Sequence, residues 1–179
     1  MNAGVRRILR VVVRLMRCPV LVGRERELAA LAVAWREVAA GRGRTVLVEG
    51  DAGIGKSRLV ERFVEVVRAR GGTVLEGACV PFLESVPYAP LPAALDALPA
   101  EGQDSSAPER GYGQLPDPSE RTRFFQRVAD GLARLSVGAP VLLVVEDLQW
   151  ADDATADLLL FLGAGHAGAA AAAGRDLAQ

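Results

Sequence analysis

Residues 50–57 read GDAGIGKS, which matches the pattern G-x-x-x-x-G-K-[ST] at every fixed position. A glycine-rich turn with this spacing lets consecutive backbone N–H groups point inward around an anion. It needs a strand before it and a helix after it, whose N-terminus faces the same anion. Thr45 to Glu49 is a short β-branched run, and an amphipathic segment follows the turn to about Ala69. The octapeptide therefore predicts a strand–turn–helix unit and an α/β fold.

The same octapeptide predicts a nucleotide site, with ATP as the ligand. Lys56 would reach the β- and γ-phosphates, and the Ser57 hydroxyl would ligate Mg²⁺. Lys56 is the one lysine among 21 basic side chains, and it stands where a compact ammonium fits better than a guanidinium fork. Arg58 would add positive charge, although we expect it to face solvent. The candidate cofactor-binding residues are Gly50, Asp51, Ala52, Gly53, Ile54, Gly55, Lys56, Ser57 and Arg58.

A second acidic motif follows a strand near the other end of the chain. Residues 141–145 (VLLVV) are wholly apolar, as in a parallel strand covered on both faces, and Glu146 and Asp147 follow. Beside a phosphate-binding loop, such carboxylates hold Mg²⁺ and orient the attacking water. We assign Glu146 to the metal and Asp147 to the water, so that Lys56 and Asp147 are the candidate catalytic residues. The alternative is that these acids simply end the strand at solvent.

The remaining segments suggest how the chain is organised. The first 17 residues carry five arginines and no acid, with apolar residues at helical spacing; they predict a basic amphipathic helix or a dispensable extension. Leu28, Leu31, Trp35 and Val38 mark a helical face. We expect a basic extension over 1–18, one domain over 19–162 and a low-complexity Ala/Gly tail over 163–179 that is disordered or a loose Ala-rich helix. Within the domain we expect helices over 25–40, 124–135 and 153–162, a short helix over 91–98 and a loop over 100–119.

Charge and composition exclude several classes of protein. A formal net charge of −1 gives no basic field for nucleic acid, so no direct DNA binding is expected. No apolar run reaches the length of a membrane span. Cys18 and Cys79 have no partnering histidine pair and lie far apart in sequence. They predict free thiols and a reducing, cytoplasmic location.

Three segments together resemble one family. They are LVGRE at residues 21–25, the octapeptide, and VLLVVEDLQWADD at residues 141–153. The chain is similar to the AAA-type ATPase module of STAND proteins, as in bacterial large ATP-binding LuxR-type transcriptional regulators. The resemblance implies a three-layer P-loop NTPase core with a parallel sheet. It also implies that Val22 and Gly23, with Arg24 nearby, flank the adenine, and that ATP drives a signalling switch.

The chain departs from that family after Leu162, where no further strand, sensor residue or helical lid can be identified. The family's sheet order is 5-1-4-3-2, so the strand missing here would lie between the P-loop strand and the strand ending at Glu146. We therefore expect a core incomplete at its C-terminus, a truncated fragment with weak or absent hydrolysis, and self-association or a protein partner through the incomplete sheet. Two alternatives stay open: a small-molecule P-loop kinase, which a phosphoryl-acceptor assay would reveal, and a non-catalytic interaction remnant.

Overall fold

The computed structural model describes residues 8–13, 23–51, 53–81, 83, 86–91 and 117–173. Within them, four parallel strands form a sheet in the order β2-β1-β4-β3. The strands are β1 (Ile8–Val13), β2 (Arg44–Val48), β3 (Thr73–Ala78) and β4 (Val141–Glu146). The helices are α1 (Glu25–Ala39), α2 (Lys56–Ala69), α4 (Pro118–Gly138) and α5 (Asp153–Ala173), with a short 3-10 helix, η2 (Leu148–Trp150), after β4.

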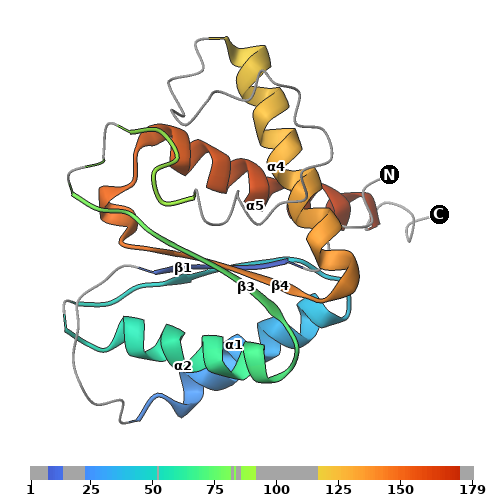
Figure 1. Ribbon diagram of the computed structural model, residues 1–179. Helices are drawn as coiled ribbons and strands as arrows, with labels where there is room; N and C mark the ends of the chain where they lie inside the picture. The colour runs from blue at the N-terminus through green and yellow to red at the C-terminus, as the bar shows by residue number, and fades with distance from the viewer. Residues whose placement is uncertain are drawn as a thin grey trace.

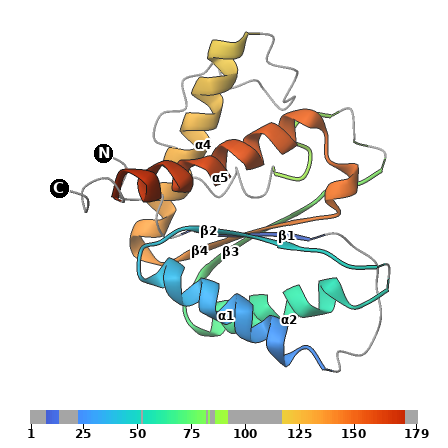
Figure 2. The ribbon, with the colours of Figure 1, turned by 180° about the vertical axis from the view of Figure 1, so that it is seen from behind.

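The elements form three layers. Helices α1 and α2 cover one face of the sheet, and α4 and α5 cover the other (Figures 1 and 2). Parallel strands require crossover connections, and the helices of those crossovers come to lie on the faces of the sheet. The predicted α/β core with a parallel sheet is therefore confirmed.

Strand β4 shows why the sheet is covered on both sides. Its residues from Val141 to Val145 are all buried, and successive side chains point to opposite faces. Leu142 and Val144 belong to the core cluster formed with α1 and α2. The other three belong to the cluster formed with α4 and α5. An uninterrupted apolar run is thus what this position in the sheet requires.

The two helices beside the P-loop are amphipathic, as their sequences predict. In α1 the residues Leu31, Trp35 and Val38 are buried. The rings of Trp35 and Phe63 meet edge to face, with centroids 6.5 Å apart, which joins α1 to α2. In α2 the buried apolar residues recur at helical spacing; they are Leu59, Val60, Phe63, Val64 and Val67. This packing fixes α2, and with it the turn that precedes α2, against the sheet.

The N-terminal segment differs most from the sequence prediction. The two alternatives for the first 17 residues are a basic amphipathic helix and a dispensable extension, and neither fits Ile8–Val13, which form strand β1 in the middle of the sheet (Figure 1). β1 pairs with β2 on one side and with β4 on the other. It therefore fills the position that the sequence left empty between the P-loop strand and the strand ending at Glu146.

Other expectations concern helix ends and connections. Helix α5 begins at Asp153, as predicted, but continues to Ala173, beyond the predicted end at Leu162. Asp117 caps α4, since its carboxylate accepts a hydrogen bond from Ser119 N at 2.8 Å. The predicted short helix over 91–98 and loop over 100–119 lie almost wholly outside the described residues, as do Val22 and Ala52. Among the helices in the described part of the chain, none is long and apolar enough to cross a membrane.

Candidate functional site: a phosphate-binding loop facing an acidic strand end

The glycine-rich turn joins β2 to α2 at the carboxyl edge of the sheet. Gly53 and Gly55 have φ of 79° and 91°, a left-handed conformation that side chains with a Cβ rarely adopt. Gly55 is also the N-cap of α2, and its carbonyl accepts the first helical hydrogen bond, from Leu59 N at 3.0 Å. The free N–H groups at the start of α2 therefore lie at the turn, where an anion would gain from them.

Lys56, the first residue of α2, is held inside this turn. Its side chain is 3% exposed, and Nζ donates hydrogen bonds to the carbonyl oxygens of Gly50 at 2.7 Å and Asp51 at 2.8 Å. A buried ammonium must be compensated by such acceptors. The two carbonyl acceptors therefore hold the ammonium at the mouth of the glycine-rich turn, beside the N-terminus of α2.

Ser57 lies next to Lys56 and turns its hydroxyl toward the end of β4. The residue is buried, and its Oγ makes no hydrogen bond of acceptable geometry within the described structure. The same hydroxyl is near enough to the Glu146 carboxylate to lower the pKa of that group. Burying a hydroxyl without a hydrogen-bond partner costs free energy. A cation that takes oxygen ligands would offset this cost at Ser57.

Glu146, the last residue of β4, lies in an electrostatic setting that disfavours its negative charge. Burial is the largest cause that raises the pKa of its carboxyl above the ordinary value. The neighbouring negative charges of Asp147 and Glu61 raise the pKa further, against the smaller effect of Ser57. A divalent cation prefers oxygen ligands and would reverse this repulsion. The Ser57 hydroxyl and the Glu146 carboxylate are therefore a donor set that suits Mg²⁺.

Asp147 follows Glu146 in an unusual backbone conformation. Its φ of 58° is left-handed, which aspartate tolerates better than most residues, and it begins η2. Its Oδ1 accepts a hydrogen bond from Gln149 Nε2 at 3.0 Å, and its carbonyl accepts one from Trp150 N at 2.9 Å. The turn fixes the Asp147 carboxylate just beyond the strand end. Trp150, the last residue of η2, is 39% exposed.

Arg24 makes a contact with the turn that sequence reasoning missed. Its Nη2 donates to the Ile54 carbonyl at 2.8 Å, and its Nη1 pairs with the Glu27 carboxylate at 2.6 Å. That pairing is the main cause that lowers the pKa of Glu27. The segment before α1 is thereby tied to the turn across thirty residues. No local pattern signals such a contact, whereas the resemblance placed Arg24 only near the adenine. Gly23 precedes it, exposed and with a φ of 75°.

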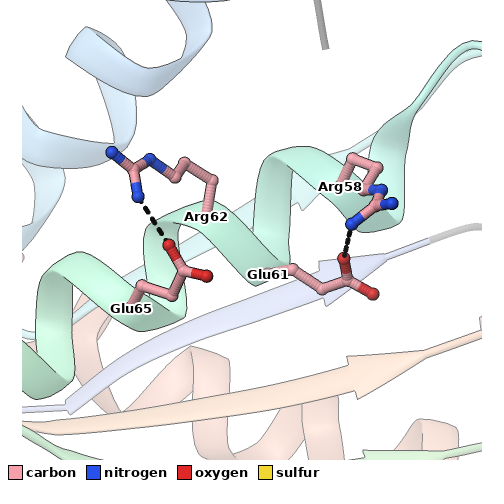
Figure 3. Close-up of polar contacts among 4 residues, drawn as sticks. All are labelled: Arg58, Glu61, Arg62 and Glu65. Atoms are coloured by element: carbon pink, nitrogen blue, oxygen red, sulfur yellow. Dashed lines mark hydrogen bonds and ion pairs between the residues drawn. The ribbon is translucent and has the colours of Figure 1, made fainter. Parts of the chain in front are cut away.

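Arg58 lies on the other side of α2 from the buried residues. Figure 3 shows its guanidinium paired with Glu61 at 3.3 Å, and Arg62 paired with Glu65 at 2.6 Å one turn later. All four side chains are more than half exposed. Such i,i+3 pairs stabilise a helix only weakly and mark its solvent face.

Two neighbouring groups at this edge have structural roles. The Asp152 carboxylate accepts hydrogen bonds from the N–H and hydroxyl of Thr155, and it thereby caps the N-terminus of α5. Cys79 follows β3 and is buried as a free thiol. Burial, followed by the charges of Asp152 and Asp147, raises its pKa to about 11, so the thiol stays protonated near neutral pH. Within the described residues, no group of three or more His, Cys, Asp or Glu side chains could hold a metal alone.

Comparison with known proteins places this geometry in context. The AAA ATPase domain family matches residues 20–168. The chain is also 30% identical over 170 residues to the "Uncharacterized protein R02095" of Rhizobium meliloti (strain 1021). That match covers 78% of this chain but 16% of the relative, so the chain corresponds to a small part of that protein's length. No solved structure was found to match the chain.

Proposed function

Because the chain belongs to the AAA ATPase domain family and carries a P-loop ATPase module, we propose that it binds Mg·ATP between the turn Gly50–Ser57 and the end of β4. The observation that carries the proposal is the buried, unpartnered Ser57 hydroxyl beside the Glu146 carboxylate. Both groups offer oxygen atoms, and a magnesium ion carried by a nucleotide would offset the buried negative charge at Glu146.

Each residue of the site then has a distinct role toward the ligand. Lys56 would exchange its two carbonyl acceptors for β- and γ-phosphate oxygens, while the backbone N–H groups at the start of α2 bind the phosphates. Ser57 would ligate Mg²⁺ directly and Glu146 through water, and the ion would neutralise charge on the phosphates. Asp147, fixed by its turn, would orient the attacking water. Val22 and Gly23 would flank the adenine.

Hydrolysis is proposed to be slow, and the module to act in regulation. Among the described residues, the charged groups near the turn are already used: Arg24 binds the Ile54 carbonyl, and Arg58 pairs with Glu61. A cation that stabilises the transferred phosphoryl group can be worth about 10³–10⁵ in rate. With no further cation beside the turn in the described part of the chain, a nucleotide-dependent switch, as in STAND and LuxR-type regulators, fits the module better than a fast enzyme.

Titration with a fluorescent ATP analogue in the presence of Mg²⁺ tests the proposal. Lys56→Ala removes a charge-assisted contact worth about 1.5–3 kcal/mol, so the affinity should fall about ten- to more than a hundredfold. Arg62→Ala is the matched control, because Arg62 is a cation on the same helix that is exposed and paired with Glu65. Its affinity should equal that of the parent.

The outcome against the proposal is equally definite. If the parent bound the analogue and Lys56→Ala bound it with the same affinity, the ligand would not be held by the turn. If neither bound it, the turn would be a structural connection only.

A further inference from the structure

Strand β1 occupies the one position in the sheet that separates the two halves of the site. It pairs with the P-loop strand β2 on one side and with β4, which ends at Glu146, on the other. Its residues, 8–13, lie outside the segment 20–168 that matches the AAA ATPase domain family. A segment that the family match does not include therefore lies between the phosphate-binding turn and the acidic strand end.

We propose that β1 is a positioning element of the nucleotide site: a spacer strand that sets the distance between Ser57 and Glu146. The inference rests on the proposed function, because a spacing matters only if a ligand has to fit into it. The new claim is that residues 8–13, which are far from the glycine-rich turn in sequence, determine the geometry of the site.

The spacing follows from the geometry of a parallel sheet. Neighbouring strands lie about 4.8 Å apart, so one intervening strand places β2 and β4 about 9.6 Å apart. A Mg²⁺ ion with directly bound oxygens on opposite sides, here Ser57 Oγ and a water that donates to Glu146, would span about 4.1 Å. Direct pairing of β2 with β4 would remove one strand spacing, which is about the width that the ion and its ligands need.

The register of β1 brings the three strand ends level at the site. Val13, the last residue of β1, is in register with Val48 at the end of β2 and with Glu146 at the end of β4. The turn begins immediately after β2. A shift of β1 by one or more residues would therefore move the turn relative to Glu146 along the strand direction, by about 3.3 Å for each residue.

Full-length variants test two things separately: whether β1 lies beside β2, and whether β1 affects nucleotide binding. A disulfide between Val12→Cys and Leu47→Cys, with Cys18 and Cys79 replaced by alanine, should form in air, because these two positions are in register on adjacent strands. The pair Val12→Cys with Glu49→Cys is the control. It lies two residues out of register, about 8 Å apart between Cα atoms, and should not close. The locked protein should bind the ATP analogue with the Mg²⁺ dependence of the parent.

Breaking the strand should then affect the metal-dependent part of binding. Val11→Pro removes a ladder N–H in the middle of β1, and Ala3→Pro is the matched proline before the strand. Val11→Pro should reduce the enhancement of affinity by Mg²⁺ about 10- to 100-fold, as loss of a supporting group around a metal does, while weaker binding in EDTA persists. Ala3→Pro should behave like the parent.

Three results would count against the proposal, and they differ from one another. Failure of the in-register disulfide to form would show that β1 is not beside β2. Unchanged Mg²⁺ dependence in Val11→Pro would show that β1 does not set the spacing, although the proposed function would stand. A parent that formed the disulfide but bound no nucleotide would overturn the proposed function, and with it the role of β1 there.

Discussion

Replacing Gly77 by alanine should destabilise the protein through a single, well-defined collision. Gly77 lies in β3, in register with Val145. A Cβ at this position would lie 1.7 Å from the Pro90 carbonyl oxygen and 2.8 Å from its carbonyl carbon. An unstrained C···O contact is about 3.3 Å, so the turn that carries Pro90 must move by about 1.5 Å. The obstacle is backbone, so no side-chain rotation can relieve it.

The size of the effect follows from what that turn buries. Tyr88 and Leu91 flank Pro90, and each is 2% exposed in the core cluster beneath α4 and α5. Exposing one large apolar side chain costs about 1.5–3 kcal/mol, so half-exposing two costs about the same. With strain in the displaced turn, we expect a loss of about 3 kcal/mol, or about 6–12 °C in melting temperature for a chain of this size.

Thermal melts followed by circular dichroism measure this directly, and Gly138→Ala is the matched control. Gly138 ends α4, and a Cβ there meets nothing within 4 Å. The same chemical change should therefore leave the melting temperature unchanged or raise it slightly. Equal melting temperatures for Gly77→Ala and Gly138→Ala would refute the packing of the Pro90 turn against β3.

Further predictions concern the site. The pKa of Glu146 is raised above its ordinary 4.5, so the folded state binds its proton more tightly than the unfolded state does. The metal-free protein should therefore lose stability as the pH rises from about 4.5 through the folded-state pKa. Glu146→Gln should remove this loss, measured as the difference in melting temperature between pH 4 and pH 7. Arg24→Ala should weaken binding of the ATP analogue about three- to tenfold without lowering the melting temperature. Arg26→Ala, the control, should change neither quantity. Equal affinities of Arg24→Ala and the parent would show that the contact with the Ile54 carbonyl does not contribute to binding. Steady-state phosphate release should be slow and slower still for Asp147→Asn, and turnover near 10 per second would contradict the proposed switch.

The sequence predicted the parts of the fold in which local pattern and tertiary burial agree. The buried run at Val141–Val145 requires cover on both faces, and β4 is covered on both faces. The spacing of Leu59, Phe63 and Val67 predicts the buried face of α2. In each of these elements the apolar residues follow a pattern that fits only one type of secondary structure at that place in the core. Local propensity and tertiary packing therefore favour the same structure.

The prediction failed where two structures suit the same residues. Residues 8–13 read ILRVVV, which is rich in β-branched residues but also has apolar residues at helical spacing. The open position between β2 and β4 decides the outcome, and no local pattern reveals that position. Helix α5 continues past Leu162 as an Ala-rich helix, which is one of the two expectations for the tail, since alanine has the highest helix propensity and needs no amphipathic pattern.

The candidate site divides in the same way. The motif placed Lys56 and Ser57 correctly at the start of α2, because its spacing is a property of one continuous turn. The contact of Arg24 with the Ile54 carbonyl joins residues thirty apart, and it follows from how α1 packs against α2.

A crystal structure of the full chain grown with Mg·ADP would test the central claim most directly. The account predicts the β-phosphate within the turn Gly50–Ser57, and Mg²⁺ about 2.1 Å from Ser57 Oγ. It also predicts that the Glu146 carboxylate accepts a hydrogen bond from a water bound to that ion, with β1 still between β2 and β4. A nucleotide bound elsewhere, or an ion held in the turn without Ser57 and facing away from Glu146, would contradict it.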